Sequence, residues 1–163
     1  MAENFYTAAG TSVAIGTTLD IDLKLSDSAI LTAFAGDTYT EVELVEDVGE
    51  FGDEATAVTF TALKDSRVRK AKGSRDAGTI ALVCARLPDD AGQDILRTAE
   101  KSPLDYNLRI TLDDRLTDAG DPTVYYMRVK IMSQRTAVGS VDNVIRTTFN
   151  LGINSAIYEI EAD

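Results

Sequence analysis

The sequence predicts a mainly β protein, built of two antiparallel sheets packed as a sandwich or barrel with one flanking α-helix. Apolar and polar residues alternate with a period of two through most of the chain, which is typical of half-buried strands. One segment, residues 89–101, instead spaces its apolar residues as a helix does. The strands follow one another without alternating helices, which favours antiparallel sheets over a parallel α/β arrangement.

The first half of the chain predicts short strands and at most one turn of helix. TSVAIG (11–16) fits a short strand, and SDSAILTAFAG (26–36) fits a single helical turn with Asp27 as N-cap and Gly36 beyond its end. The next alternating runs are Thr40–Asp47 and Ala57–Ala62. The basic segment 63–78 follows, and we expect it to form an extended loop.

The second half of the chain predicts the helix and most of the sheet. In the helical segment Asp89 or Asp90 is a natural N-cap, and Pro103 ends the helix. The polar connector DDRLTDAGD (113–121) separates two alternating runs, so we expect an antiparallel hairpin there. The predicted strands of this half are Thr79–Leu87, Asp105–Asp114, Pro122–Gln134, Val144–Ile153 and Ser155–Glu161.

Composition indicates a single soluble domain over residues 1–163. Hydrophobic residues make up 44% and charged residues 26% of the chain, as in ordinary globular proteins. The apolar run Ile80–Ala85 is far shorter than the roughly 20 residues of a membrane span. The N-terminal residues lack the pattern of a secretory signal. We therefore expect synthesis in the cytoplasm and no membrane partner.

The residues needed for common catalytic chemistry are missing. The chain has no histidine, which excludes a Ser-His-Asp triad, a Cys-His pair and histidine metal ligands. Its single cysteine, Cys84, lies in an apolar run and is expected to be a buried, inert thiol. The pair Asp89 and Asp90 fits a helix cap better than a catalytic site. We assign no catalytic, cofactor-binding or metal-binding residue and do not expect an enzyme.

The charge is strongly segregated along the chain. The net charge is −11, yet Lys64–Arg75 holds six basic residues and one acid, a local net of +5. The acids cluster just upstream. Three interpretations stay open: two solvated loops, a DNA-binding loop, or a basic loop that meets the acidic face of another copy. For the third, the interface candidates are Arg67, Arg69, Lys70, Lys72, Arg75, Glu41, Glu43, Glu46, Glu50, Asp53 and Glu54.

Three segments together resemble one protein family. Val45–Leu82 contains GEFGDE and KGSRD, Pro88–Ala99 contains DDAGQ, and Val138–Ile157 contains VDN before a late strand. The combination resembles the tail tube proteins (major tail proteins) of long non-contractile-tailed bacteriophages, the siphovirus or lambda-like tail tube family. Residues 1–39 match that family poorly.

The resemblance implies a structural role in the tail of a virion. Members of the family form six-membered rings that stack head to tail around a tape-measure protein, between tail terminator and tail-tip proteins. Double-stranded DNA passes through the lumen at genome ejection without specific binding, and gene transfer agent tails are related. The alternative is a monomeric ligand-binding β-sandwich or barrel domain. If the protein is a tail tube subunit, we expect residues 63–78 to be loosely folded in the monomer and to become ordered against acidic residues of a neighbouring subunit.

Overall fold

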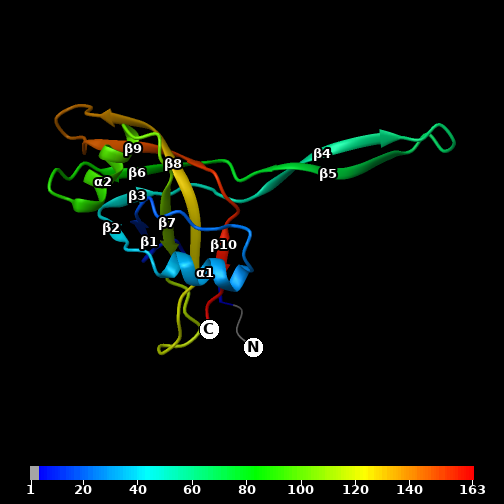
Figure 1. Cartoon of the computed structure of the whole chain (residues 1–163). Coiled ribbons are helices and arrows are strands. Elements are labelled where there is room, and N and C mark those ends of the chain that lie inside the picture. The colour runs from blue at the N-terminus through cyan, green and yellow to red at the C-terminus, as the bar shows by residue number, and fades with distance from the viewer. Residues whose placement is uncertain (1–3) are drawn as a thin grey trace.

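The computed structural model describes residues 4–163 as a mainly β body from which a long arm projects (Figure 1). This part of the chain forms two antiparallel sheets, so the predicted fold class is confirmed, with two helices rather than one. The elements are β1 Ser12–Ile15, α1 Asp27–Ala35, β2 Thr40–Val42, β3 Val45–Asp47, β4 Glu54–Thr61, β5 Val68–Asp76, β6 Thr79–Ala85, α2 Ala91–Glu100, β7 Tyr106–Thr111, β8 Val124–Ala137, β9 Arg146–Ile153 and β10 Tyr158–Ile160.

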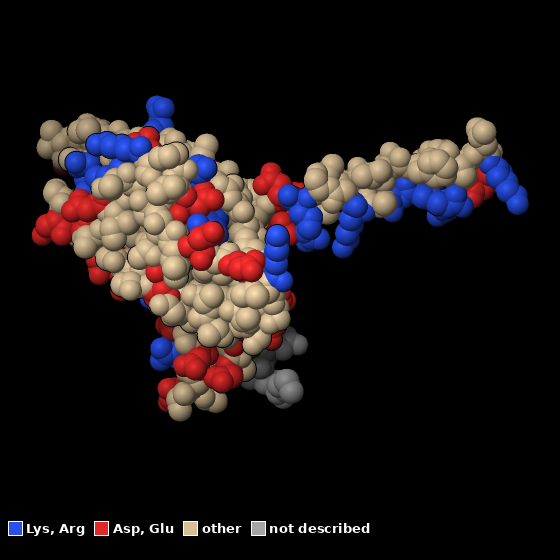
Figure 2. Space-filling model, viewed as in Figure 1, with Lys and Arg blue, Asp and Glu red and all other residues tan. Residues whose placement is uncertain are grey.

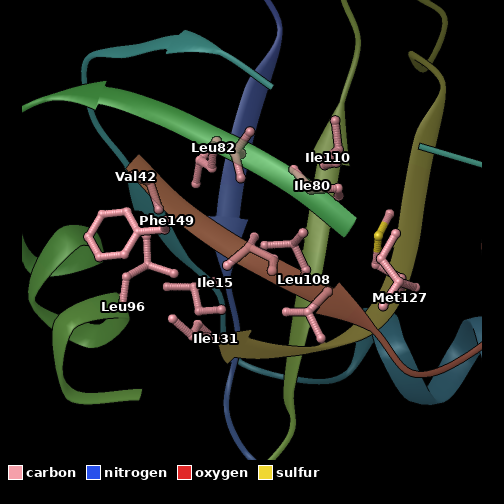
Figure 3. Packing of buried hydrophobic residues seen from close by; sticks show 14 of the residues in the cluster. Ile15, Val42, Ile80, Leu82, Leu96, Leu108, Ile110, Met127, Ile131 and Phe149 are labelled. Atoms are coloured by element: carbon pink, nitrogen blue, oxygen red, sulfur yellow. The ribbon is translucent and has the colours of Figure 1, made fainter. Parts of the chain in front are cut away.

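The body is one eight-stranded sheet that bends along β8. Its strand order is β2-β1-β7-β8-β9-β6-β3, with β10 beside β8. The first part of β8 pairs with β7, and the part beyond Val129 pairs with β9 through an irregularity between Ile131 and Ser133. Figure 3 shows that β6 and β9 therefore cross over β1 and β7. The core fills the space between these two layers.

Alternation along the strands supplies the core side chains. On β9 every second residue is buried, including Phe149 and Leu151, and on β6 the buried residues are Ile80, Leu82 and Cys84. Burying each large apolar side chain contributes about 1.5–3 kcal/mol. Cys84 is fully buried, as expected, and this burial raises the pKa of its thiol. The sequence prediction of these two strands is confirmed.

Helix α2 is tied to the sheet by a buried polar contact as well as by its apolar stripe. Asp90 is its N-cap and accepts a hydrogen bond from the Gln93 N–H at 3.0 Å. The side chain of Gln93 is fully buried, and its amide donates to the carbonyls of Glu43 at 3.1 Å and Ala85 at 2.9 Å. Its oxygen accepts from the Leu87 N–H. Such a satisfied buried group fixes one position of the helix.

The predicted strand Thr40–Asp47 is wrong, because the chain forms two strands separated by a turn. Leu44 has a φ of 55°, in the left-handed region that interrupts a strand. The Glu43 N–H donates to Asp90 Oδ2 at 3.2 Å, and its carbonyl accepts from Gln93. These backbone groups face the helix, so β2 and β3 pair with different neighbours at opposite ends of the strand order.

Helix α1 is longer than the single turn that the sequence predicts. It spans nine residues, and its N-cap is Ser26 rather than Asp27. Ile30 and Phe34 are buried on it, and the Phe34 ring stacks on Tyr126 at 5.7 Å between centroids. These residues belong to a second apolar cluster that includes side chains of β8 and β10. Packing in this cluster stabilises the extra helical turns, which the helix propensity of the segment alone would not stabilise.

Asp37 joins the N-terminal half to the sheet. It accepts hydrogen bonds from the Thr17 N–H at 2.9 Å, the Thr17 hydroxyl at 2.6 Å, the Asn107 amide at 2.7 Å and the Thr38 N–H at 2.8 Å. Partial burial opposes the charge, but these bonds outweigh it and lower the pKa of Asp37. The carboxylate therefore stabilises the fold above its unfolded pKa of about 3.9.

Replacing Asp37 by Asn should destabilise the protein most at neutral pH. Asn has one acceptor oxygen in place of two, and each unsatisfied donor costs about 1–3 kcal/mol. The difference in unfolding free energy from wild type should shrink below about pH 4, as the native carboxylate protonates. Urea unfolding at a series of pH values measures it. A difference that does not change with pH would contradict this role.

Replacing Gly92 by Ala should destabilise the fold although Ala favours helices. A Cβ at Gly92 would lie 2.3 Å from the carbonyl oxygen of Glu41. We expect a loss of about 1–3 kcal/mol from this overpacking. Gly52→Ala is the matched control, because a Cβ there meets nothing within 4 Å, and it should be neutral or mildly stabilising. Equal effects of the two changes in urea unfolding would refute the proposed close approach.

Candidate assembly interface

The arm is the two-stranded sheet formed by β4 and β5 (Figure 1). The two strands pair from Glu54↔Asp76 to Thr61↔Val68, with an irregularity between Ala55 and Ala57. The prediction of an extended loop over residues 63–78 is therefore wrong for Val68–Asp76, which form a strand, whereas loose folding of the segment before assembly stays a prediction. Strand β5 lacks a buried face, so it carries no alternating pattern in the sequence, and its pairing with β4 alone makes it a strand.

The two faces of the arm differ in chemistry. Residues directly opposite each other share a face, and Val58 opposes Ala71 while Phe60 opposes Arg69. The other face carries Lys70 and Lys72 opposite Thr59 and Ala57. Figure 2 shows the basic side chains gathered along one side of the arm and uncharged residues along the other. The arm thus presents a mainly apolar face, which includes Arg69, and a cationic face with Lys70 and Lys72.

Within residues 4–163, no helix or strand covers either face. No other helix or strand packs extensively on β4 or β5. The Phe60 side chain is 66% exposed, and Leu63 at the tip is fully exposed. An isolated two-stranded hairpin is at best marginally stable in water, and exposed apolar residues grouped in this way are typical of protein contact sites. The arm therefore has the properties of a segment that is completed by a partner.

The basic interface candidates divide into paired and unpaired residues. Arg69 forms an ion pair with Asp65 at 2.5 Å, and Arg75 forms one with Asp53 at 2.6 Å. Both pairs are largely exposed, and exposed pairs contribute little stability. Within residues 4–163, the other three candidates have no acidic side chain within 4 Å; these are Arg67, Lys70 and Lys72.

The acidic interface candidates do not form one surface. Glu50, Asp53 and Glu54 lie at the root of the arm, where Asp53 is the one that contacts a basic candidate. Glu46 on β3 pairs instead with Arg146 on β9. The rest lie near α2: Glu41 on β2 and Glu43 in the turn that follows. Their role in contacts between copies stays a prediction.

A surface recess beside the root of the arm holds acids that the sequence prediction missed. Its volume is about 400 Å³, and Asp113 and Asp114 line it together with Glu46 and Asp47. In the sequence, Asp113 and Asp114 belong to the polar connector 113–121 and are expected to be turn residues after β7. The sequence did place these two aspartates directly after a buried strand. It could not show that the acids of β3 lie beside them, because only the fold brings the two segments together.

The arm and the recess provide exposed surfaces suited to protein contacts. Within residues 4–163 no group of three or more His, Cys, Asp or Glu side chains is placed to hold a metal ion. In the same part of the chain, no helix has the length and apolar character to cross a membrane. The prominent features are the two-faced arm and the acidic body from which it projects (Figure 2).

Comparison with solved structures identifies the architecture. Family profiles and curated proteins give no sequence match. A chain in the anti-feeding prophage baseplate has a TM-score of 0.70 and 9% identity, over 99% of this chain and 98% of that one. The SPP1 tail tube gives 0.61 and 10%, over 93% and 76%. The chain has a tail-tube fold.

A third similarity extends this observation to the end of a tube. The sheath/tube terminator of an extracellular contractile injection system has a TM-score of 0.65 and 10% identity, covering 98% of this chain and 99% of that one. At these identities the likeness concerns the fold alone. The tail-tube part of the sequence resemblance is therefore supported, and membership of the lambda-like family stays a prediction.

Shortening the arm should leave the body folded. Because the arm does not contribute to the core, replacing residues 58–71 by Asn-Gly should connect Ala57 to Lys72 through a two-residue hairpin turn. We expect the unfolding free energy to change by less than about 1 kcal/mol, measured by urea unfolding of the monomer. A loss of several kcal/mol would show that the arm supports the body.

Proposed function

We propose that this protein is a structural subunit that assembles with copies of itself into stacked rings, forming a tail tube. The observation that carries the proposal is the arm, whose two faces are left uncovered by the other described residues of the chain. The tail-tube fold supports it, because tube and terminator components share this architecture. No residue arrangement in the described part of the chain supports an enzymatic function.

Opposite charges favour contact between the arm of one copy and the body of another. The arm segment Lys64–Arg75 carries a net charge of +5 within a chain of −11, so the arm of one copy is attracted to the body of another. Complementary charge speeds the encounter and sets the register more than it adds affinity. Two different surfaces of one molecule form the contact, which is heterologous. Repeating such a contact closes a ring or extends a filament.

The ring symmetry and the partners that we propose come from the resemblance of the sequence to tail tube proteins. We propose six-membered rings stacked head to tail, with a tape-measure protein in the lumen and terminator and tip proteins at the two ends. Part of the remaining negative charge would line the lumen and repel DNA during its passage. The subunit would belong to the virion tail after synthesis in the bacterial cytoplasm.

The alternative function is a monomeric ligand-binding domain. Buried apolar side chains pack in the interior of the body, as Figure 3 shows for part of the cluster. The recess beside the arm is within the size range of small-molecule pockets, about 300–1,000 Å³. It would be the site if the protein remained monomeric at all concentrations.

Reversing two charges on the arm should prevent assembly without unfolding the protein. Lys70→Glu with Lys72→Glu places acids on the cationic face, so like charges would meet the acidic body. Negative-stain microscopy and light scattering should show tubes or rings for the wild type and monomers for this variant. The matched control is Lys24→Glu with Lys101→Glu, the same change of charge at exposed positions of the body, which should still assemble. Normal tubes from the arm variant would refute the proposal.

A further inference from the structure

We propose that the recess beside the root of the arm is the acceptor for the arm tip of a second copy. This inference rests on the proposed function and gives the contact a location. The recess is bounded by the N-terminal segment at Tyr6–Ala8, by β3 and the loop after it, and by the end of β7. The arm tip is the turn Ala62–Arg67 that joins β4 to β5.

The floor of the recess is apolar and incompletely covered. Val45, Val48, Phe51 and Leu112 line it, and each keeps part of its surface exposed to solvent. They pack against the main core from outside, and Phe51 contacts Tyr125 edge to face at 5.1 Å. A floor of this kind gains stability when an apolar side chain enters it and excludes water.

Three of the four acids on the rim lack an ion-pair partner within residues 4–163. Of the four acids, Glu46 alone has a cationic partner, Arg146, within the described residues. Asp47 accepts the Gly49 N–H at 2.8 Å, and the Thr123 hydroxyl and N–H bond Asp114 and lower the pKa of its carboxyl. Within residues 4–163, neither of these two carboxylates has a basic side chain within 4 Å. Asp113 is exposed, and no hydrogen bond or ion pair engages its carboxylate in the described part of the chain.

The arm tip has the complementary chemistry. Leu63 is fully exposed in this turn, and the cations Lys64 and Arg67 follow it in the same turn. The turn is held in shape by Asp65, which accepts from the Arg67 N–H at 3.1 Å and pairs with Arg69. The tip thus combines an exposed apolar side chain with two cations, and the recess combines an apolar floor with carboxylates that lack a cationic partner in the described residues. The occupant is narrow, because a single two-stranded turn enters the recess.

The occupant must come from another copy. Phe51 lines the recess, and β4 begins three residues later, so a chain's own arm starts beside its own recess and runs away from it (Figure 1). The backbone pairing of β4 with β5 keeps the tip at the far end. The tip therefore cannot fold back, and a tip-to-root contact links successive copies in a heterologous chain.

Cross-linking between two singly substituted proteins tests the location. Arg67→Cys protein is mixed with Asp113→Cys protein under assembly conditions and treated with a short bismaleimide. Cys84 is buried and should not react. We expect a covalent dimer that needs both substitutions. Asp142→Cys, exposed in the loop before β9, and Glu50→Cys, at the arm root outside this recess, are the matched controls, and their yield should be several-fold lower.

The outcomes separate this inference from the proposed function. If particles assemble but the Arg67–Asp113 yield does not exceed that of the controls, the recess is not the acceptor, although assembly through the arm stands. If no cross-link forms at any protein concentration, the recess inference also fails. A dominant cross-link to Glu50→Cys would move the contact to the arm root.

A charge exchange provides an independent measurement. Arg67→Glu or Asp113→Arg alone should raise the critical concentration for assembly about fivefold, equivalent to the ~1 kcal/mol of a good exposed pair. The double variant should recover most of that loss, because the pair is restored with reversed signs. Additive losses in the double variant would overturn the pairing of these two residues.

Discussion

The central constraint on this molecule is that its arm cannot bury its own faces. A two-stranded ribbon has a single layer, and the register of β4 with β5 places Val58 and Phe60 on one side and Lys70 and Lys72 on the other. Both sides meet solvent in a single chain. Apolar burial of these residues therefore requires a second molecule, and under the proposed function the body presents the arm of its own chain and receives the arm of another.

The body provides the rigid support that such an arm needs. At the root, Asp53 pairs with Arg75 across the two strands, and Phe51 anchors the incoming chain on Tyr125. Behind the root, the buried Gln93 amide holds the turn between β2 and β3 against α2, which positions β3 at the edge of the recess. A rigid root lowers the entropic cost of ordering the arm on a partner, since only the ribbon itself remains to be fixed.

Much of the body could be predicted from the sequence, because its patterns are local. Strands β6 and β9 have one buried face and one exposed face, so alternation identifies them, and the cap and apolar stripe identify α2. The break at Leu44 could not be predicted, because hydrogen bonds from the distant Asp90 and Gln93 produce it. Strand β5 has no buried face and left no pattern. The positive charge of the arm could be predicted from the basic segment, whereas Glu46 and Asp113 come together in the recess only through the fold.

A cryo-EM reconstruction of the assembled particle tests the central claim most directly. The account predicts that the arm of every copy lies against another copy, with Phe60 buried and the arm tip in contact with the body of its neighbour. Density that shows the arm extended into solvent, touching no other subunit, would contradict it, because the particle would then be held together by other surfaces.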